Sequence, residues 1–261
     1  MTIILLNLIN NYMKYIPLLT FLFGSLLLAD NEIYIDQVGS TGTYNLTQIG
    51  DGNTIGTGDD IAYINGDSNI FTITQLGNSN DILWWSNGDE TLVDIYTEGD
   101  YNDLDIYFTG NKNDLDIVFV GDSNTLKIEG YIDGNTALID NQDFDLNVYG
   151  SSNALDFSLN DTAFSKIDYD VLGGFNSVDS VQEGNPGGVG HTQIVDILGN
   201  NNTLDIHQSG LNSQILEINH IGSDTTFTII QSDGYYNTAD ITPPLNSSSS
   251  WIYTGAGNDQ P

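Results

Sequence analysis

An eleven-residue pattern of apolar and polar positions runs through most of this 261-residue chain. Each unit begins with apolar residues at alternating positions and ends with a Gly-x-x-Asn sequence. Alternation at every second residue is typical of a strand with one buried face. Glycine adopts positive φ angles without steric cost, and asparagine tolerates them better than most residues. One unit therefore predicts a strand of about five residues followed by a tight corner.

The apolar positions of successive units form two series. Their members are Ile73, Ile95 and Ile117 in one series, and Trp84, Ile106 and Ile128 in the other. One unit cannot bury its apolar face alone, so two units are expected to face each other as strand–turn–strand–turn. The pattern predicts an all-β fold, a parallel β-solenoid with about 22 residues per coil. Residues i and i+22 are then vertical neighbours about 4.8 Å apart, and the two series become facing columns of the core.

Three polar positions repeat with the same period. The corner glycines are Gly50, Gly77, Gly88, Gly99, Gly110 and Gly121. The corner asparagines are Asn53, Asn69, Asn80, Asn102, Asn113 and Asn124, with Thr91 in the same series. A glutamine position is filled by Gln37, Gln48, Gln75, Gln182, Gln208 and Gln231, and between these by Ser86, Thr97, Phe108, Phe119, Val171, Ile197 and His220.

Stacked amides can bond to the amides above and below them, as in cross-β ladders. We expect such a ladder for the glutamines, because glutamine has no role in turns. For the asparagines, the chemistry of the corner is by itself a sufficient explanation. The sequence leaves a ladder and a corner role open for asparagine.

The period slips at several places. Asn53 and Asn69 are 16 residues apart, which predicts an insertion of five residues near 56–60. The register is disturbed near 130–143 and 160–166, although an unbroken period would place Asn135, Ala137 and Ile139 in the columns. Residues 183–190 contain a proline and four glycines, and this stretch predicts a loop.

Two segments carry a resemblance to a known family. Residues 46–53 read Leu-Thr-Gln-Ile-Gly-Asp-Gly-Asn, and residues 73–80 read Ile-Thr-Gln-Leu-Gly-Asn-Ser-Asn. They resemble the curlin repeat, which places Gln, Gly and Asn at these positions, and the resemblance covers residues 33 to about 241. Curlins are secreted subunits of curli, the functional amyloid fibres of Gram-negative bacteria.

The resemblance implies a secreted subunit or nucleator of such fibres, located outside the cell or at the surface of a Gram-negative bacterium. Its implied partners are further copies of itself, other curlin-type subunits and the outer-membrane secretion machinery. The implied roles are cell adhesion and biofilm matrix. The alternative is a monomeric acidic β-solenoid that serves as an adhesin or binding module and has capped ends.

The N-terminus predicts export. Lys14 precedes an apolar run at 16–28, and Ala29 precedes the first acidic residue, as in a signal peptide covering residues 1–29. An uncleaved anchor is the alternative, although the run is short for a bilayer span of about 20 residues. The repeat array is assigned to 30–241, and a Pro/Ser-rich C-terminal segment to 242–261.

The net charge of the chain excludes some classes of partner. The chain has 36 acidic residues, four lysines and no arginine, and its formal charge is −32. Such a chain repels nucleic acid and anionic membranes. The aspartates between the two apolar positions are expected to face outward: Asp94, Asp105, Asp116, Asp156, Asp168 and Asp205. They predict a solvated acidic face. Alternatively, repulsion between these aspartates prevents assembly until low pH or weakly bound divalent cations relieve it.

Catalytic chemistry has no clear basis in the sequence. There is no cysteine, and the three histidines, His191, His207 and His220, are expected to be exposed on the repeat. The carboxylates follow the repeat and need no catalytic explanation. We therefore expect no enzyme, no cofactor, no metal site and no small-molecule substrate.

Overall fold

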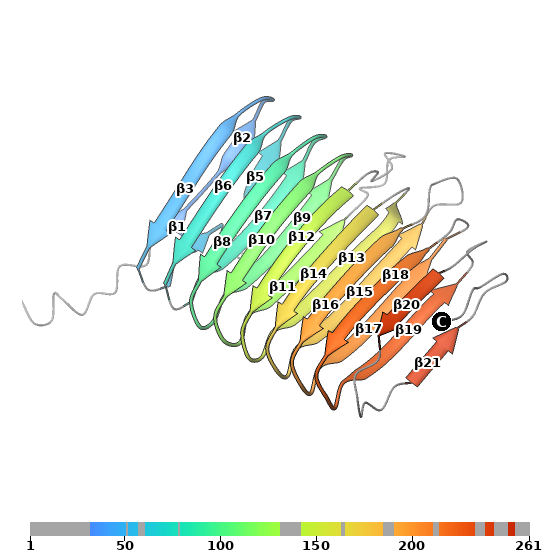
Figure 1. The fold of residues 1–261 in the computed structure, drawn as a ribbon. Helices are drawn as coiled ribbons and strands as arrows, with labels where there is room; N and C mark the ends of the chain where they lie inside the picture. The colour runs from blue at the N-terminus through green and yellow to red at the C-terminus, as the bar shows by residue number, and fades with distance from the viewer. Residues whose placement is uncertain are drawn as a thin grey trace, which may run out of the picture.

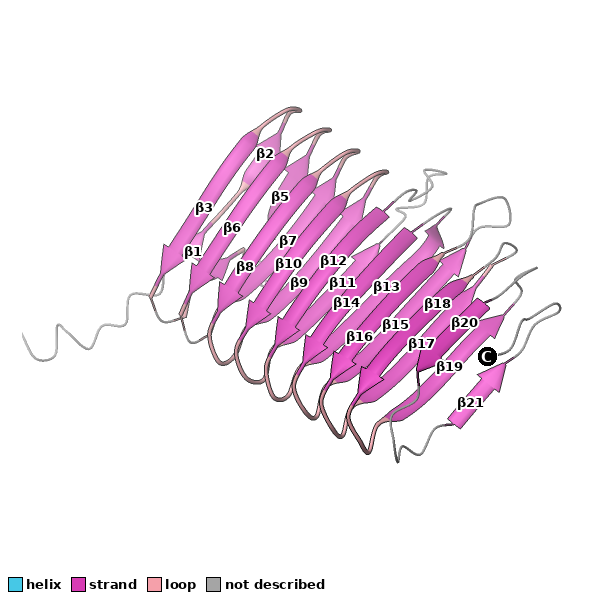
Figure 2. Cartoon of the chain, in the orientation of Figure 1, coloured by secondary structure: helices cyan, strands magenta, loops and turns pink. Residues whose placement is uncertain are grey.

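The computed structural model describes residues 32–50, 52–56, 61–77, 79–130, 142–162, 165–184, 191–210, 214–232, 238–242 and 250–253. The predicted signal peptide at 1–29 lies outside these residues. Every described element is a β-strand, and the strands form two parallel sheets that face each other (Figures 1 and 2). Among these residues there is no apolar helix of membrane-spanning length.

The first sheet, sheet A, contains β1 (Glu32–Ile33), β2 (Asp36–Val38), β4 (Thr54–Ile55), β5 (Ala62–Asn65), β7 (Asp81–Asn87), β9 (Asp103–Thr109), β11 (Thr125–Gly130), β13 (Ala154–Thr162), β15 (Ser177–Gly184), β17 (Thr203–Ser209), β19 (Thr226–Ser232) and β21 (Ser250–Tyr253). The second, sheet B, contains β3 (Thr43–Ile49), β6 (Ile70–Leu76), β8 (Leu92–Glu98), β10 (Asp114–Val120), β12 (Gln142–Tyr149), β14 (Ser165–Leu172), β16 (Thr192–Leu198), β18 (Ile215–Ile221) and β20 (Thr238–Thr242).

From β6 onward, successive strands alternate between the sheets, and each pairs in parallel with the strand one coil later. The predicted fold class, an all-β parallel solenoid, is confirmed, with about 23 residues per coil. The predicted 22-residue spacing holds in the central coils, where Ile70 pairs with Leu92 and Leu92 pairs with Asp114. Sheet A also continues past residue 241, because β21 pairs with β19.

The longer coils accommodate their extra residues without changing the register of the core. Thr43 pairs with Ile70, 27 residues on, as an insertion of five residues requires. Both β4 and β5 pair with β7, so the insertion interrupts a strand and leaves the corner unchanged.

The unbroken period does not continue past residue 130, in agreement with the disturbance of register expected near 130–143. Asn135, Ala137 and Ile139 lie outside the described residues, and their places in the columns are taken by residues seven positions later. Phe144 stacks on Leu115 and Leu146 on Ile117. The alternating sequence of β12 restores the same buried face after the insertion, so the stack continues.

The buried face of each strand contributes to one continuous core. Ile73, Ile95 and Ile117 are register neighbours in sheet B, and all are at most 2% exposed. Trp84, Ile106 and Ile128 are register neighbours in sheet A, and all are at most 1% exposed. Full burial of each such side chain stabilises the fold by about 1.5–3 kcal/mol. The apolar columns therefore stabilise the stack at every coil along the solenoid axis.

The corner glycines stack in two columns, one at each edge of the solenoid. A Cβ added to Gly77, Gly99 or Gly121 would overlap the carbonyl oxygen of the glycine one coil earlier in that column. The other column behaves in the same way, with Gly110 over Gly88. The backbones approach too closely at these corners for any side chain, so stacking by itself requires glycine there. At Gly110 and Gly121 the backbone conformation adds to this requirement, because their φ angles are 110° and 152°.

The turn preference of asparagine suggested that the asparagine is the left-handed residue of the corner, but it is not. Where a corner contains a left-handed residue other than glycine, it is the residue immediately before the asparagine position. These residues are Thr41, Ser68, Glu90, Lys112, Ser123, Phe175, Asn201 and Asp224, with φ between 57° and 66°. The asparagine therefore has another role at the corner, which depends on the hydrogen bonds of its side chain.

One corner offers a matched test of the stacking constraint. Gly121→Ala should lower the free energy of unfolding by about 1–3 kcal/mol, because the new methyl group displaces the Gly99 carbonyl. Ser123→Gly, two residues on, should leave stability unchanged or raise it by up to about 1 kcal/mol, since it relieves a left-handed φ of 66°. Urea unfolding followed by circular dichroism measures both. Equal effects of the two variants would contradict the assignment.

Candidate functional site: polar ladders and sheet edges

A ladder of asparagine side chains runs along the corner that leads from sheet B to sheet A. Each side-chain amide donates from Nδ2 to Oδ1 of the asparagine one coil later, over 2.7–3.1 Å. Its members, the Asn ladder, are Asn53, Asn80, Asn102, Asn124, Asn153 and Asn176. All are at most 2% exposed, so these bonds form away from solvent, where an unsatisfied amide would be costly.

The same amides also close their own corners. Asn102 Nδ2 donates to the carbonyl oxygen of Gly99 at 2.8 Å, and Asn124 Nδ2 donates to that of Gly121 at 2.7 Å. The corner role and the ladder role, which the sequence left as alternatives, are therefore performed by one side chain. In this protein, the asparagine of a Gly-x-x-Asn corner both closes the turn and hydrogen-bonds to the next coil.

The opposite corner, from sheet A to sheet B, is held differently. Its column of buried residues is mixed: Asn69, Thr91, Asn113, Gln142, Ser165, His191 and Gln214. Asn69 closes its corner on the Gly66 carbonyl at 2.8 Å. Asn113 Oδ1 accepts the backbone N–H of Thr91 at 3.1 Å, but the Thr91 side chain has no amide to continue a ladder.

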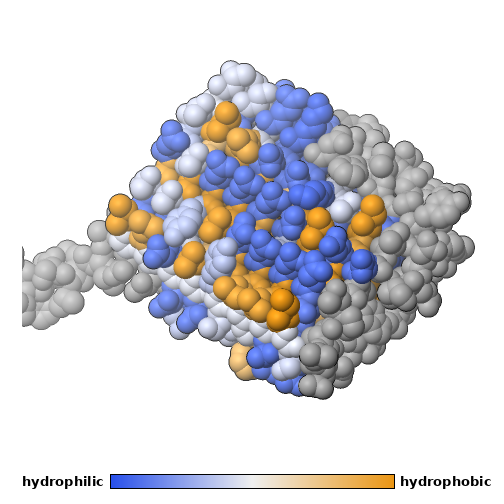
Figure 3. Space-filling view, in the orientation of Figure 1, coloured by the Kyte–Doolittle hydropathy of each residue, from blue (hydrophilic) through white to orange (hydrophobic). Residues whose placement is uncertain are grey.

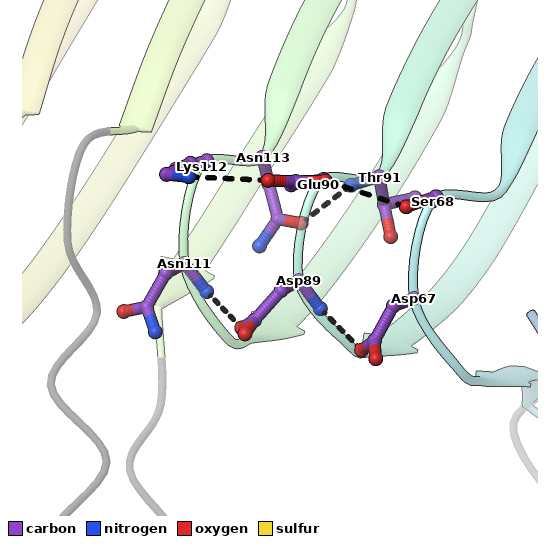
Figure 4. Close-up of polar contacts among 8 residues, drawn as sticks. All are labelled: Asp67, Ser68, Asp89, Glu90, Thr91, Asn111, Lys112 and Asn113. Atoms are coloured by element: carbon purple, nitrogen blue, oxygen red, sulfur yellow. Dashed lines mark hydrogen bonds and ion pairs between the residues drawn. The ribbon is translucent and has the colours of Figure 1, made fainter.

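Outer residues of this corner add a second set of contacts between coils (Figure 4). The backbone N–H of Asp89 donates to the Asp67 carboxylate at 2.9 Å, and that of Asn111 donates to the Asp89 carboxylate at 2.6 Å. Lys112 pairs with Glu90 at 3.1 Å, but their side chains are 60% and 55% exposed. Such an exposed pair contributes at most about 1 kcal/mol. The carboxylate–N–H contacts are thus the more directional link at this corner.

The glutamine position forms two short ladders on opposite sheets. In sheet B, Gln75 Nε2 donates to Gln48 Oε1 at 2.8 Å. In sheet A, Gln208 donates to Gln182 at 3.0 Å and Gln231 donates to Gln208 at 2.9 Å. The glutamine position faces inward, and between the ladders it belongs to the apolar core.

Gln37, the remaining predicted member of the glutamine series, lies opposite Ile64 and has no glutamine neighbour in the next coil. Gln75 is followed in its column by Thr97, which ends the sheet B ladder. Elsewhere in these two columns the buried residues are apolar, with Phe108 in sheet A and Phe119 and Val171 in sheet B, and they contribute packing in place of amide bonds.

Sequence reasoning missed one buried polar cluster. Gln193 occupies a position that is apolar in the neighbouring coils, opposite Ile167 and Leu216. Its Nε2 donates to Gln182 Oε1 at 2.9 Å and to Ser180 Oγ at 3.0 Å, and so joins the two sheets across the core. The signal was available, since Gln193 and Ser180 both interrupt the apolar alternation of their strands.

Two histidines are buried, so the expectation that all three are exposed was wrong. His191 occupies a corner position and His220 a glutamine position, and both positions face inward. Burial lowers the pKa of His191 to about 4. His220 also has a lowered pKa, mainly through burial, and its Nε2 lies 2.7 Å from Thr225 Oγ1. No cluster of three or more His, Asp or Glu suited to a metal occurs in the described part of the chain.

The outward aspartates form vertical columns. In sheet B the column contains Asp94, Asp116, Asp145 and Asp168, each in register with the next. The column of sheet A contains Asp105, Lys127, Asp156, Asp179 and Asp205. Partial burial, followed by repulsion from Asp145 and Asp94, raises the pKa of Asp116. Lys166 lies 3.1 Å from Asp145 and 3.6 Å from Asp168 and offsets part of this repulsion.

The first coil has an uncovered side. The inward residues Tyr44 and Leu46 of β3 are only partly buried, whereas their neighbours Phe71 and Ile73 are fully buried. Ile33 of β1 and Ile35, which lies between β1 and β2, are likewise partly buried. Among the described strands, β3 pairs only with β6. Within the described part of the chain, the first coil therefore presents unpaired strand edges together with an apolar surface.

No family model, curated protein or solved structure matches the chain.

The double role of the ladder gives a sharp stability prediction. Asn102→Ala removes bonds to Asn80, Asn124 and Gly99 and leaves buried polar groups unpaired, which should cost about 2–3 kcal/mol of unfolding free energy. Asn87→Ala is the control, because Asn87 is exposed and accepts one bond from Thr109. It should change stability by at most about 0.5 kcal/mol. Denaturant unfolding compares the two, and a control as damaging as Asn102→Ala would contradict the ladder's importance.

The acidic columns predict that neutralisation stabilises the fold. The pKa of Asp114 is raised to about 6, first by partial burial and then by Asp116, Asp143, Asp145 and Asp94. A carboxyl whose pKa rises on folding is destabilising when ionised, so its cost is present above pH about 6 and fades toward pH about 4. Asp114→Asn should therefore raise the urea midpoint at pH about 7.5, and the gain should vanish below pH about 4.

The comparison must be made between variants, because His191 acts in the opposite direction over part of the same range. Its lowered pKa makes the fold less stable as pH falls from about 6.5 toward about 4. Asp100→Asn, at an exposed corner, serves as the matched control for loss of one negative charge. A stabilisation by Asp114→Asn that does not depend on pH, or that Asp100→Asn reproduces, would contradict the account.

Proposed function

We propose that this chain is a secreted structural protein of the curlin type, a subunit or nucleator of extracellular amyloid-like fibres, and not an enzyme. In this proposal it acts outside a Gram-negative cell in adhesion and biofilm matrix, after export through the outer-membrane secretion machinery. The partners are further copies of the chain or other curlin-type subunits. The supporting features are the parallel solenoid, the buried Asn and Gln ladders and the resemblance of residues 46–53 and 73–80 to the curlin repeat.

The unpaired edge of β3 carries the proposal. Ile70 N–H donates to Gly42 C=O and Gly50 N–H donates to Leu76 C=O. Since backbone groups alternate in direction along a strand, Gly42, Tyr44, Leu46, Gln48 and Gly50 bond to β6. The N–H and C=O groups of Thr43, Asn45 and Thr47 point to the other side. An unpaired edge of this kind is a template for another strand.

Apolar burial adds to the backbone pairing at this edge. A strand added to β3 would complete the burial of Tyr44 and Leu46, as β8 completes that of Phe71 and Ile73 in β6. A parallel strand from a second copy supplies the same register, because coils already repeat this contact along the chain. Head-to-tail addition of copies does not close on itself, and so generates a filament.

Electron microscopy and fibre diffraction of residues 30–261 test the proposal, since this segment retains every described strand. We expect filaments with a reflection at about 4.7–4.8 Å along the fibre axis. Asn45→Pro should slow or stop elongation, because it removes one N–H from the unpaired edge and none from the β3–β6 ladder. Asn45→Ala keeps that N–H and is the control.

Each outcome separates the readings. Filaments from the wild type and from Asn45→Ala, with impaired growth of Asn45→Pro, would support strand addition at β3. A chain that remains a folded monomer without the reflection would overturn the fibre proposal and favour the capped adhesin. Filaments that grow equally well from all three would show that the β3 edge is not the growing end.

A further inference from the structure

An apolar stripe runs along the solenoid axis on the outer face of sheet B, near the ends of its later strands. Tyr149, Leu172, Leu198 and Ile221 are register neighbours in β12, β14, β16 and β18. They are 42%, 43%, 49% and 70% exposed. The face drawn in Figure 3 shows apolar surface gathered in a band among hydrophilic residues. Four neighbouring exposed apolar side chains form a patch that marks an interaction site more often than isolated ones do.

A shallow groove follows this stripe. Its volume is about 340 Å³, and its lining combines the four apolar side chains with Asp170, Asp196 and Asn219. These three polar residues are also register neighbours, two positions before the apolar ones on β14, β16 and β18. The groove therefore has an apolar wall and a parallel polar wall with two carboxylates.

The carboxylates of the groove lack a cation within the described residues. The three lysines there pair elsewhere: Lys112 with Glu90, Lys127 with Glu129, and Lys166 with Asp143, Asp145 and Asp168. Asp196 accepts a hydrogen bond from Asn219 at 2.8 Å, which orients it along the groove wall.

Charge decides between the occupants of the groove. A second copy of this chain would bring a surface of formal charge −32 against an acidic wall, and like charges placed opposite each other disfavour that contact. A partner with apolar and basic side chains satisfies both walls. The groove lies on a sheet face and away from the sheet edges, so this inference is independent of fibre growth.

Spacing selects the form of the partner. The groove's side chains repeat once per coil, about every 4.8 Å along the axis. On an α-helix, apolar residues at i, i+3, i+4 and i+7 advance about 5.4 Å per turn, with basic residues on the adjacent flank at the same interval. We propose that this groove binds a basic amphipathic helix of another protein, with its apolar face on Leu172, Leu198 and Ile221 and its lysines or arginines beside Asp170 and Asp196.

Two synthetic peptides serve as probes. One is an 18-residue helix with a leucine stripe and lysines along one flank, and the other carries glutamate in place of each lysine. Fluorescence anisotropy of the labelled peptides, titrated with the chain in low salt, should show saturable binding of the basic peptide only. Binding should weaken as salt is raised, because part of the attraction is electrostatic. Equal binding of both peptides, or binding of neither, would overturn the proposal.

Outward-facing variants locate the binding. Leu172→Ser with Leu198→Ser should weaken the basic peptide by about tenfold or more, since the helix loses apolar contact area. Ile70→Ser with Ile215→Ser is the matched control, because both residues are exposed on sheet B outside the groove, at 40% and 48%. The control should stay within about twofold of the wild type.

Charge variants separate the groove from the general acidity of the surface. Asp170→Asn with Asp196→Asn should weaken the basic peptide by about three- to tenfold and reduce its salt dependence. Asp94→Asn with Asp116→Asn removes the same charge from the same sheet outside the groove. Equal losses for the two pairs would mean that the peptide binds the surface non-specifically, and that result would overturn the groove assignment.

Discussion

The close approach of backbones at the corners is the constraint on which the rest of this structure depends. Gly77, Gly99 and Gly121 lie so near the glycine carbonyls of the preceding coil that no side chain fits between them. That contact fixes the vertical distance between coils at the value that strand pairing requires. Only at this distance do the apolar columns close and the asparagine amides reach one another. These corner glycines are thus required by their contact with the neighbouring coil, and Gly121 by its own turn as well.

The columns inside the solenoid combine packing and hydrogen bonding in different proportions along the axis. The Asn ladder continues over six coils, whereas each glutamine ladder is short and lies in a different sheet. Where Phe108 and Phe119 replace glutamine, the core gains apolar volume and loses amide bonds. In the later coils, Gln193 links the two sheets through Gln182 and Ser180. The fold tolerates these exchanges because every inward side chain packs against the residue at the equivalent position of the next coil.

The sequence predicted what its period controls. The two apolar columns, the parallel stacking and the insertion before β5 follow from spacing alone. Positions that follow an insertion were harder to assign, because the repeat does not show how many residues the insertion adds. Asn135 was therefore given a place that Gln142 occupies. The Gln193–Gln182 contact joins facing sheets, and a one-dimensional period gives no information on which residues meet across the core. The phase of His191 was lost after the predicted loop at 183–190, whereas His220 stood at the glutamine position, whose alternation with the apolar positions already implied burial.

Hydrogen exchange of backbone amides tests the central claim most directly, namely that coils hold one another by in-register stacking and that the first coil can accept another. In the soluble chain, amides of β8 and β10 should be strongly protected, whereas those of Asn45 and Thr47 should exchange rapidly. After assembly, the amides of Asn45 and Thr47 should become as protected as those of β8. Rapid exchange in β8 and β10, or unprotected Asn45 and Thr47 within assembled fibres, would contradict the account.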